Sequence, residues 1–222
     1  MRLRKRNLEI ILSKFSPHPR PAAELEQYEL TPEAAAKIVT YAFDRGDIQG
    51  RRVCDLGCGT GRLALAAAIC GAREVLCVDI DPVALNTLRE NINIAERSSP
   101  VTVRTRVKLK QTDVAQVDVE STGVFDTVVQ NPPFGVQRSS SDRVFLRKAL
   151  ELAPFVYSLH KRGDSVERFI LAYVSQLGGE VEGKIPIDFH IPHQFDFHRK
   201  PRYTVEADLF MIRRKDYVAE ED

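Results

Sequence analysis

Residues 51–61 read Arg-Arg-Val-Cys-Asp-Leu-Gly-Cys-Gly-Thr-Gly, and this stretch decides the fold. Its first part, 51–56, holds Val53, Cys54 and Leu56 and predicts a short strand. The glycines that follow predict a tight turn, and an Ala/Leu-rich run from about Leu63 to Cys70 predicts a helix. Backbone N–H groups at the start of a helix are unpaired, and glycine lets a ligand approach them closely. The stretch therefore predicts a strand, a ligand-binding turn and a helix, in that order.

Outside this stretch, predicted strands and helices alternate along the chain. The strand over 101–110 rests on strict alternation, with one apolar face and one basic face. The order of elements predicts an α/β fold with a doubly wound, mainly parallel sheet and an antiparallel C-terminal strand. We expect a single domain over 1–222, with a basic N-terminal extension at 1–21 and an acidic tail at 214–222. Further strands are predicted at 74–80, 125–130, 184–191 and 203–213, and helices at 3–15, 32–43, 82–95, 144–152 and 165–177.

Composition places the 222 residues among globular proteins, with 43% hydrophobic and 28% charged side chains. The net charge of +1 argues neither for nor against a nucleic-acid partner. Residues 1–20 hold six basic side chains and one acidic side chain, and they predict either an RNA anchor or a solvated helix face. No apolar run is long enough to span a membrane, and no secretory signal is found. We therefore expect no contact with a membrane.

The cysteines indicate a reducing compartment. Cys54, Cys58, Cys70 and Cys77 lie within one short stretch and contain no C-x-x-C pair, so neither disulfides nor a zinc site is expected. His190, His193 and His198 lack a matching set of Cys or acidic ligands, so they are expected to be loop residues and no metal is predicted. The predicted location is the cytoplasm.

Three acidic residues follow predicted strands. Asp55 and Asp79 end the first two strands of the pattern, and Asp113 comes after the third. The carboxyl ends of parallel strands meet at one edge of a doubly wound sheet, where an acid after the second strand binds the hydroxyls of a ribose. Asp113 is suited to accept from an adenine amino group. The glycines alone match a dinucleotide fingerprint only weakly, and one alternative is that they merely turn the chain.

This combination resembles the class I S-adenosylmethionine-dependent methyltransferases. Members of that superfamily carry an acidic residue ahead of the glycine turn, here Asp55, which distinguishes them from nicotinamide-dependent enzymes. The resemblance implies a Rossmann-like fold with S-adenosylmethionine as the cofactor. A nicotinamide oxidoreductase stays as the weakest alternative.

Residues 125–135, Phe-Asp-Thr-Val-Val-Gln-Asn-Pro-Pro-Phe-Gly, point to the reaction. A predicted strand ends at Gln130, and the two prolines after Asn131 hold the chain in a stiff extended turn. The turn presents an amide oxygen, free carbonyls and the ring of Phe134. One alternative is a rigid strand end without chemistry. Within the superfamily, however, an N-P-P-F run resembles the amino-methyltransferases that act on adenine, guanine or glutamine amides.

The chemistry of such an acceptor fits these residues. An amine conjugated into a purine is a poor nucleophile, and hydrogen bonds from its N–H groups to Asn131 Oδ1 and the Pro132 carbonyl favour the pyramidal transition state. Stacking of the base on Phe134 contributes about 1–3 kcal/mol. We expect no strong general base, because the amine becomes acidic as it attacks. The target base has to be single-stranded or flipped out of a duplex.

Further motifs narrow the resemblance to one family. The runs 25–28 (Leu-Glu-Gln-Tyr), 156–161 (Val-Tyr-Ser-Leu-His-Lys) and 197–200 (Phe-His-Arg-Lys), together with those above, resemble the methyltransferase-like protein 5 family of ribosomal RNA adenine-N6 methyltransferases. The resemblance runs from about residue 24 to 213. It implies methylation of one adenosine in small-subunit ribosomal RNA. It also implies a heterodimer with a small zinc-binding activator protein that adds a strand to the sheet edge.

The same resemblance assigns roles to individual positions. It implies cofactor binding by Gln27, Tyr28, Leu30, Thr31, Asp55, Gly57, Gly59, Thr60, Arg62, Asp79, Ile80, Asp113 and Val114. It implies that catalysis falls on Asn131, Pro132, Pro133 and Phe134. Substrate binding is assigned to Phe134, His160, Lys161, His198, Arg199 and Lys200, with an exposed structural loop as the alternative for the last five.

The chain departs from the family in two places. The family's usual Thr after the Gln-Tyr pair aligns with Leu30, and Thr31 comes one place later, so this contact is displaced or made by the backbone. After Gly135 the usual Thr-Lys is replaced by Val136-Gln137, which puts substrate contacts there in doubt. The basic face over 101–110 is either solvated or follows RNA. Alternative functions are methylation of guanine N2 or of a protein glutamine amide, and a catalytically silent ribosome-assembly factor.

Overall fold

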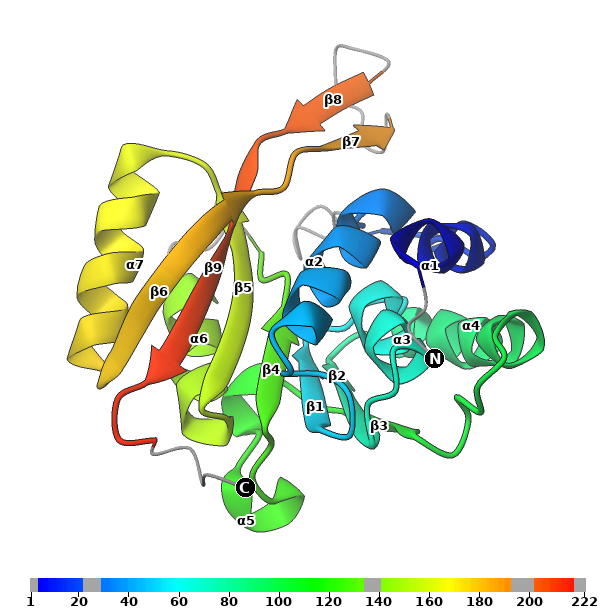
Figure 1. Cartoon of the computed structure of the whole chain (residues 1–222), viewed down its shortest axis with the longest axis horizontal. Coiled ribbons are helices and arrows are strands. Elements are labelled where there is room, and N and C mark those ends of the chain that lie inside the picture. Colours follow the sequence, from blue (N-terminus) through cyan, green and yellow to red (C-terminus); the bar gives the residue numbers. More distant parts are fainter. Residues whose placement is uncertain (1–3, 22–28, 134–140, 193–201, 218–222) are drawn as a thin grey trace.

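A computed structural model describes residues 4–21, 29–133, 141–192 and 202–217 of the chain (Figure 1). Helices and strands alternate through most of this part of the chain, as predicted. The elements are α1 (Lys5–Leu12), α2 (Pro32–Asp44), β1 (Arg52–Leu56), α3 (Arg62–Ile69), β2 (Glu74–Asp79), α4 (Pro82–Ser98), β3 (Val107–Gln111), the 3-10 helix η2 (Val114–Gln116), α5 (Val119–Thr122), β4 (Thr127–Gln130), α6 (Ser141–Leu152), β5 (Phe155–Lys161), α7 (Asp164–Gln176), β6 (Gly179–Pro186), β7 (Phe189–Pro192), β8 (Arg202–Val205) and β9 (Ala207–Arg214).

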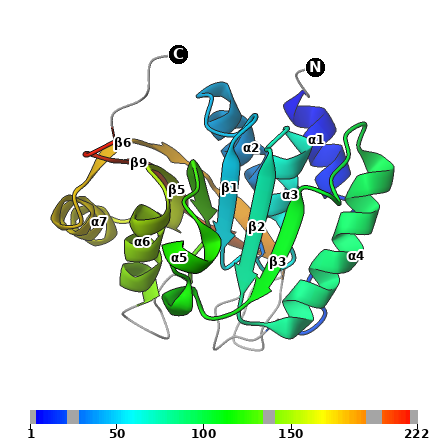
Figure 2. The same ribbon diagram turned by 90° about the horizontal axis from the view of Figure 1, so that it is seen from below.

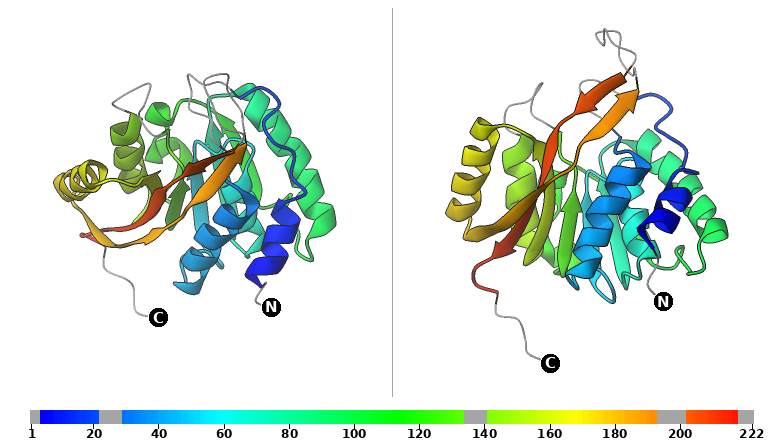
Figure 3. Two further views of the ribbon diagram at one scale, coloured as in Figure 1. Left: turned by 90° about the horizontal axis from the view of Figure 1, so that it is seen from above. Right: turned by 45° about the horizontal axis from the view of Figure 1, so that its top comes forward.

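Seven strands form one sheet in the order β3-β2-β1-β4-β5-β9-β6. Strands β3 to β5 are parallel, and β9 runs antiparallel between β5 and β6. Strands β7 and β8 pair separately and project beyond the main sheet (Figures 1 and 3). The prediction of a doubly wound, mainly parallel sheet with an antiparallel C-terminal strand is confirmed.

Two apolar cores cover the two faces of this sheet. Helices α1, α2, α3 and α4 pack in one core, and η2, α6 and α7 pack in the other (Figure 2). Helix α3 reads Arg-Leu-Ala-Leu-Ala-Ala-Ala-Ile, and every residue after the first is buried. Small alanine side chains let this helix lie close against the central strand β1, which is buried from Val53 to Leu56. The glycine turn that joins them is therefore held between two rigid elements.

Strand register brings the ends of three strands to one edge. Leu56 at the end of β1 pairs with Val78 on one side and with Gln130 on the other. The next residues along the neighbouring strands are Asp79 and Asn131. The carboxyl edge of the sheet thus gathers the glycine turn, the acid after β2 and the amide after β4.

Helix α1 buries one side of the N-terminal segment. Leu8, Ile11 and Leu12 are buried, whereas the basic residues of 4–6 are exposed. The helix packs on α2 and joins the first core. Arg4, Lys5 and Arg6 thus lie on the solvated side of this segment.

The strand predicted over 101–110 is wrong in its first half. Only Val107–Gln111 is a strand, and the preceding backbone is held by Glu96, whose Oε2 accepts from the amides of Val103 (2.7 Å) and Arg104 (2.9 Å). Val103 is buried as the alternation predicted, but Thr105 on the same predicted face is exposed, so the alternation of residue types does not reflect a strand there. Most of the predicted basic face contacts the protein itself; Lys108, for example, pairs with Glu74 at 2.7 Å.

The C-terminal half contains one strand that was not predicted and two breaks that were not expected. Strand β5 was missed because its sequence includes Ser158, His160 and Lys161, which do not look like a buried strand. The predicted strand 184–191 is divided between β6 and β7, and 203–213 is divided between β8 and β9. Both breaks lie where the chain leaves the main sheet to form the projecting pair.

Candidate active site

The glycine turn after β1 is held by hydrogen bonds from its backbone amides to strand β2. The amides of Gly57 and Cys58 both donate to the Val78 carbonyl, each at 2.9 Å. Gly61 has φ +90°, and a Cβ there would lie 2.1 Å from Leu88 Cδ1. Gly59, at φ +52°, has nothing within 4 Å of such a Cβ. The turn is therefore packed against α4 at one end and leaves open space above Gly59.

Asp55 is a buried carboxylate beneath this turn. Its Oδ2 accepts from the Ala64 amide at 2.9 Å, whereas the buried Oδ1 has no hydrogen-bond partner among the described residues. Burial raises the pKa of Asp55 to about 8, and the nearby charge of Asp79 adds to this effect against the opposing Ala64 amide. With this pKa the ligand-free Asp55 keeps its proton at neutral pH, which avoids a buried charge but leaves Oδ1 without a hydrogen-bond partner among the described residues.

The pKa of Asp55 predicts how stability depends on pH. Its pKa is about 8 in the folded protein and about 4 in the unfolded chain, so the ligand-free protein binds the extra proton and loses stability as pH rises through this window. We expect Asp55→Asn to lose this dependence, and thus to gain stability relative to wild type at pH 8.5 compared with pH 5. Urea unfolding of both proteins at both pH values measures it. An unchanged difference between the two would contradict the assignment.

Asp79 at the end of β2 is fixed by two backbone donors. Its Oδ2 accepts from the Gly59 amide at 2.7 Å and its Oδ1 from the Asp81 amide at 2.9 Å. Burial is the largest effect on the pKa of Asp79 and raises it, although these donors act in the other direction. Beside it, the side chain of Ile80 is 51% exposed. A fixed carboxylate next to an exposed apolar side chain suits a ribose joined to a flat base.

Asp113 stands at the end of β3. Its side chain is exposed, and Oδ1 caps η2 by accepting from the Ala115 amide at 2.8 Å. The Thr112 amide donates to the Asp79 carbonyl at 3.0 Å, which ties the two strand ends together. Val114 is buried beneath them. The acids predicted at strand ends therefore do lie along one edge of the sheet.

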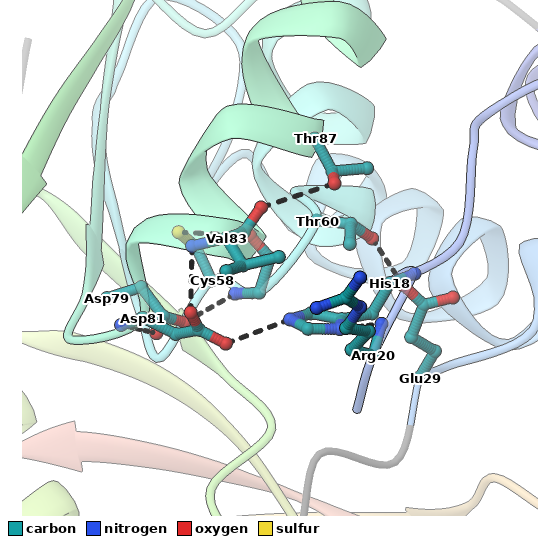
Figure 4. Close-up of polar contacts among 10 residues, drawn as sticks. His18, Arg20, Glu29, Cys58, Thr60, Asp79, Asp81, Val83 and Thr87 are labelled. Atoms are coloured by element: carbon teal, nitrogen blue, oxygen red, sulfur yellow. Dashed lines mark hydrogen bonds and ion pairs between the residues drawn. The ribbon is translucent and has the colours of Figure 1, made fainter. Parts of the chain in front are cut away.

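An N-terminal strap, residues 16–20, closes this edge (Figure 4). His18 is buried, and its Nε2 lies 2.8 Å from Asp81 Oδ2. The Arg20 amide donates to His18 Nδ1 at 3.1 Å, so Nδ1 is the acceptor and Nε2 carries the proton toward Asp81. The other oxygen of Asp81 caps α4 by accepting from the Val83 amide at 2.8 Å. The strap is thus bonded to the residue that also holds Asp79.

Glu29 joins the strap to the glycine turn. Its Oε1 accepts from the Thr60 hydroxyl at 2.7 Å and from the His18 amide at 2.8 Å (Figure 4). Its Oε2 lies 3.4 Å from the guanidinium of Arg62. Thr60 and Arg62, both predicted to bind the cofactor, are therefore held in place by a carboxylate that the sequence analysis did not single out.

Asn91 on α4 makes a third connection. Its Oδ1 accepts from the Ser16 amide at 2.8 Å, and its Nδ2 donates to the carbonyls of Ser16 and Thr60, each at 3.0 Å. Glu29 directly follows the Gln-Tyr pair, which was a signal for it. His18 sits between two prolines, and nothing in the sequence relates it or Asn91 to the turn.

The N-P-P-F run at 131–134, predicted to hold the amine that accepts the methyl group and called the acceptor motif below, begins where β4 ends. Asn131 is half-buried, Pro132 is buried and Pro133 is half-buried, at the edge of the sheet that carries Asp79. Six other residues predicted to bind cofactor or substrate lie outside the described part of the chain: Gln27, Tyr28, Phe134, His198, Arg199 and Lys200.

Two predicted cofactor residues near α2 have other contacts. Leu30 is buried, and the hydroxyl of Thr31 caps α2 by accepting from the Ala34 amide at 3.2 Å. With Pro32 at the first helical position, Thr31 forms the helix start that the sequence predicts. Contacts from these two residues to a cofactor stay predictions.

His160 does not lie where a phosphate contact requires it. The prediction expected an accessible side chain, but His160 is 1% exposed because strand β5 turns it into the core. Lys161, the next residue, is exposed. A role for Lys161 with substrate stays a prediction, and the side chain of His160 faces protein.

Within the described ranges, no group of three or more His, Cys, Asp or Glu side chains is arranged to hold a metal ion. Over the same ranges, the helices are too short or too polar to cross a bilayer.

Relatives were found both by sequence and by structure. The family model of the ribosomal protein L11 methyltransferase (PrmA) matches residues 35–131, which is less than half of the chain. An uncharacterized protein of Methanocaldococcus jannaschii is 34% identical, over 96% of this chain and 95% of its own length. The rRNA N(6)-adenosine-methyltransferase METTL5 of Danio rerio is 32% identical, over 93% of this chain and 97% of its own length.

A solved structure extends this similarity to the fold. The crystal structure of a proposed RNA methyltransferase from Pyrococcus horikoshii is 36% identical and superposes with a TM-score of 0.85, covering 96% of this chain and 99% of that one. The similarity to these proteins runs over nearly the whole length of each. The chain belongs to the METTL5 family of rRNA N(6)-adenosine-methyltransferases.

Proposed function

We propose that this protein transfers a methyl group from S-adenosylmethionine to the N6 amine of an adenosine in small-subunit ribosomal RNA. The observation that carries the proposal is the position of Asn131 and Pro132, at the sheet edge that also carries the glycine turn and Asp79. An amine acceptor and a nucleoside-bearing methyl donor can meet only where such groups converge. The relatives named as rRNA N(6)-adenosine-methyltransferases support the choice of adenosine.

The residues at this edge fit S-adenosylmethionine. Asp79 is held by two amides in a position to bind the ribose hydroxyls, and exposed Ile80 offers an apolar face to the adenine. The open space above Gly59 leaves room for a ligand against the backbone. Asp113 would accept from the adenine amine. When bound, the cofactor supplies a methyl group on a positively charged sulfur, which is the electrophile that an amine requires.

The protein's own contribution is to bind and orient the acceptor amine. In this proposal Asn131 Oδ1 and the Pro132 carbonyl each accept one N–H of the amine, which aims the nitrogen lone pair and favours its pyramidal form. The nitrogen loses a proton to water after it has attacked. Since both acceptors lie at the edge of a packed sheet, an adenine has to leave its stack to reach them.

Labelling of RNA tests the proposal. The protein is incubated with radiolabelled S-adenosylmethionine and total ribosomal RNA, and the RNA is digested to nucleosides. We expect the label in N6-methyladenosine. Label in guanosine would favour the guanine-N2 alternative, label in protein would favour a glutamine amide, and bound RNA without label would indicate a silent assembly factor.

We also propose a heterodimer with a small zinc-binding activator protein, working in the cytoplasm. Among the described strands, β3 forms one edge of the main sheet, so its outer backbone groups are available to pair with a partner strand. The four free cysteines, of which three are buried, suit a reducing compartment. Co-purification with zinc-containing partners tests the complex, and recovery of the chain alone would contradict it.

Cofactor affinity is expected to depend on the strap. Asp79→Ala removes the ribose acceptor, and His18→Ala removes a bond to Asp81, which in turn donates to Asp79. We expect the dissociation constant for S-adenosylmethionine to rise by about 10-fold for His18→Ala, since a hydrogen bond to a charged group contributes about 1.5–3 kcal/mol, and by more for Asp79→Ala. Isothermal titration calorimetry measures both.

His190→Ala serves as the control for the strap variant. His190 is exposed on β7, where its ring contacts Thr204, so its loss is not expected to change cofactor affinity. If His18→Ala binds S-adenosylmethionine as tightly as wild type, the strap does not support the cofactor site.

A further inference from the structure

A buried polar row lies behind the acceptor motif. It consists of Gln130, Ser158, His160 and Asp142. Gln130 Nε2 donates to Ser158 Oγ at 2.8 Å, and Ser158 Oγ lies 2.6 Å from His160 Nε2. His160 Nδ1 lies 3.5 Å from Asp142 Oδ1, but that oxygen has no hydrogen-bond partner among the described residues, so this last contact is electrostatic only. The first three side chains are at most 1% exposed. The methyl-transfer chemistry proposed above uses none of these side chains.

The chemistry of these groups fixes which atom donates and which accepts in each hydrogen bond of the row. Because Ser158 Oγ accepts from the Gln130 amide, its own hydrogen is free to be donated to His160 Nε2. The imidazole proton then sits on Nδ1, the nitrogen that faces Asp142. The ring of His160 is also held edge-on against Phe210, with ring centroids 5.8 Å apart. Ser158 and His160 therefore each have one orientation.

The surroundings of the row are apolar, so burying its polar groups costs desolvation free energy. The core on this face is built from residues such as Leu146, Val156 and Ile170. Gln130 Oε1 is buried there and has no hydrogen-bond partner among the described residues. Polar groups in such a core add little net stability, and their best-attested use is to specify one arrangement of the chain around them.

The two ends of the row lie next to the acceptor motif and at the start of α6. Gln130 is the residue directly before Asn131, and Asp142 is in the first turn of α6. His160, on the neighbouring strand β5, stands between them. The row thus connects the end of the strand that carries the acceptor motif with the start of the next helix.

We propose that His160 is a positioning residue for methyl transfer: through Ser158 and Gln130 it fixes the orientation of Asn131 at the end of β4. This inference rests on the proposed function, because Asn131 is the acceptor of the amine protons there. His160 itself does not touch the substrate. It holds the residue that does.

Two variants interrupt the row at different points. His160→Phe keeps a ring of similar size but removes both nitrogens, and Ser158→Ala removes only the hydroxyl. We expect kcat for RNA methylation to fall by about 10- to 100-fold in each, as is usual for misplacement of a reacting group. The KM for RNA and the dissociation constant for S-adenosylmethionine should stay within about 3-fold of wild type. Steady-state labelling assays and calorimetry supply these values.

Thr127→Val is the matched control. Thr127 lies at the opposite end of β4, is fully buried, and donates to the Asp47 carbonyl at 2.6 Å. The variant loses one buried hydrogen bond far from Asn131, whereas Ser158→Ala loses the two hydrogen bonds of the row. Its kcat should stay within about 2-fold of wild type. Equal losses of kcat in the two variants, or full activity of Ser158→Ala, would overturn the proposal.

A spectroscopic readout separates this inference from the proposed function. The side-chain amide signal of Asn131 is assigned in a ¹⁵N spectrum by comparison with Asn131→Ala. We expect it to shift or broaden in Ser158→Ala and His160→Phe but not in Thr127→Val. An unmoved signal overturns the positioning role even if the protein methylates RNA. A moved signal in a protein that methylates nothing instead rejects the proposed function alone.

Discussion

Asn131→Ala should lower kcat for methyl transfer by about 100- to 1,000-fold, the loss usual when one preorganised hydrogen-bonding group is removed from a transition state. In the proposed mechanism the amide oxygen accepts from the amine that attacks, and this bond strengthens as the nitrogen becomes pyramidal. Because Asn131 lies after β4 and the cofactor residues lie after β1 and β2, cofactor binding should stay within about 2-fold of wild type. Radiolabel transfer to RNA and calorimetry with S-adenosylmethionine measure the two quantities.

Asn93→Ala controls for the loss of an amide side chain. Asn93 lies on α4, and its Oδ1 accepts from the guanidinium of Arg104. The control should methylate RNA at the wild-type rate. Should Asn131→Ala lose cofactor affinity in proportion to its activity, Asn131 would be part of the cofactor site and the acceptor would be held elsewhere.

Gly61→Ala is expected to have the largest effect on stability. A non-glycine residue at φ +90° costs about 1–2 kcal/mol, and its Cβ would lie 2.1 Å from Leu88 Cδ1, inside the packed contact between the glycine turn and α4. Overpacking of this kind costs a further 1–3 kcal/mol or so. The sum is a large share of the roughly 5–15 kcal/mol that stabilises a typical domain. Urea unfolding gives the value.

Gly46→Ala separates the two causes. Gly46 has φ +85°, yet nothing lies within 4 Å of a Cβ built there. It therefore carries the cost of the backbone conformation without the contact, and should lose about 1–2 kcal/mol. If both variants lose the same amount, Leu88 moves aside and the turn is not closely packed against α4.

The sheet edge could be predicted because its signals are local. A glycine turn after a strand, and an acid after each of the next two strands, are patterns in neighbouring residues, and the doubly wound topology then brings them together. The start of α2 was predicted for the same reason, since Thr31 and Pro32 act within one turn. In contrast, alternation over 101–110 could not distinguish a strand from a turn that Glu96 holds through its side chain.

The rest of the site depends on contacts between distant residues. His18 and Asp81, Glu29 and Thr60, and Asn91 and Ser16 are pairs that only the folded chain brings together. Strand β5 was missed for a related reason: Ser158 and His160 look exposed in the sequence, but each is buried because the other supplies its hydrogen bond. Polar residues that satisfy one another in a core leave no signal in local patterns.

The N-terminal strap couples binding of the cofactor to docking of the N-terminal segment. His18 is hydrogen-bonded to Asp81, and the Asp81 amide donates to Asp79, the proposed ribose acid. Docking of the strap and binding of the cofactor therefore depend on the same contacts. Thermodynamic coupling of this kind is reciprocal. A bound methyl donor would hold the amino terminus down, and any fusion or neighbour that pulls on the terminus would weaken the hold on the donor by the same factor.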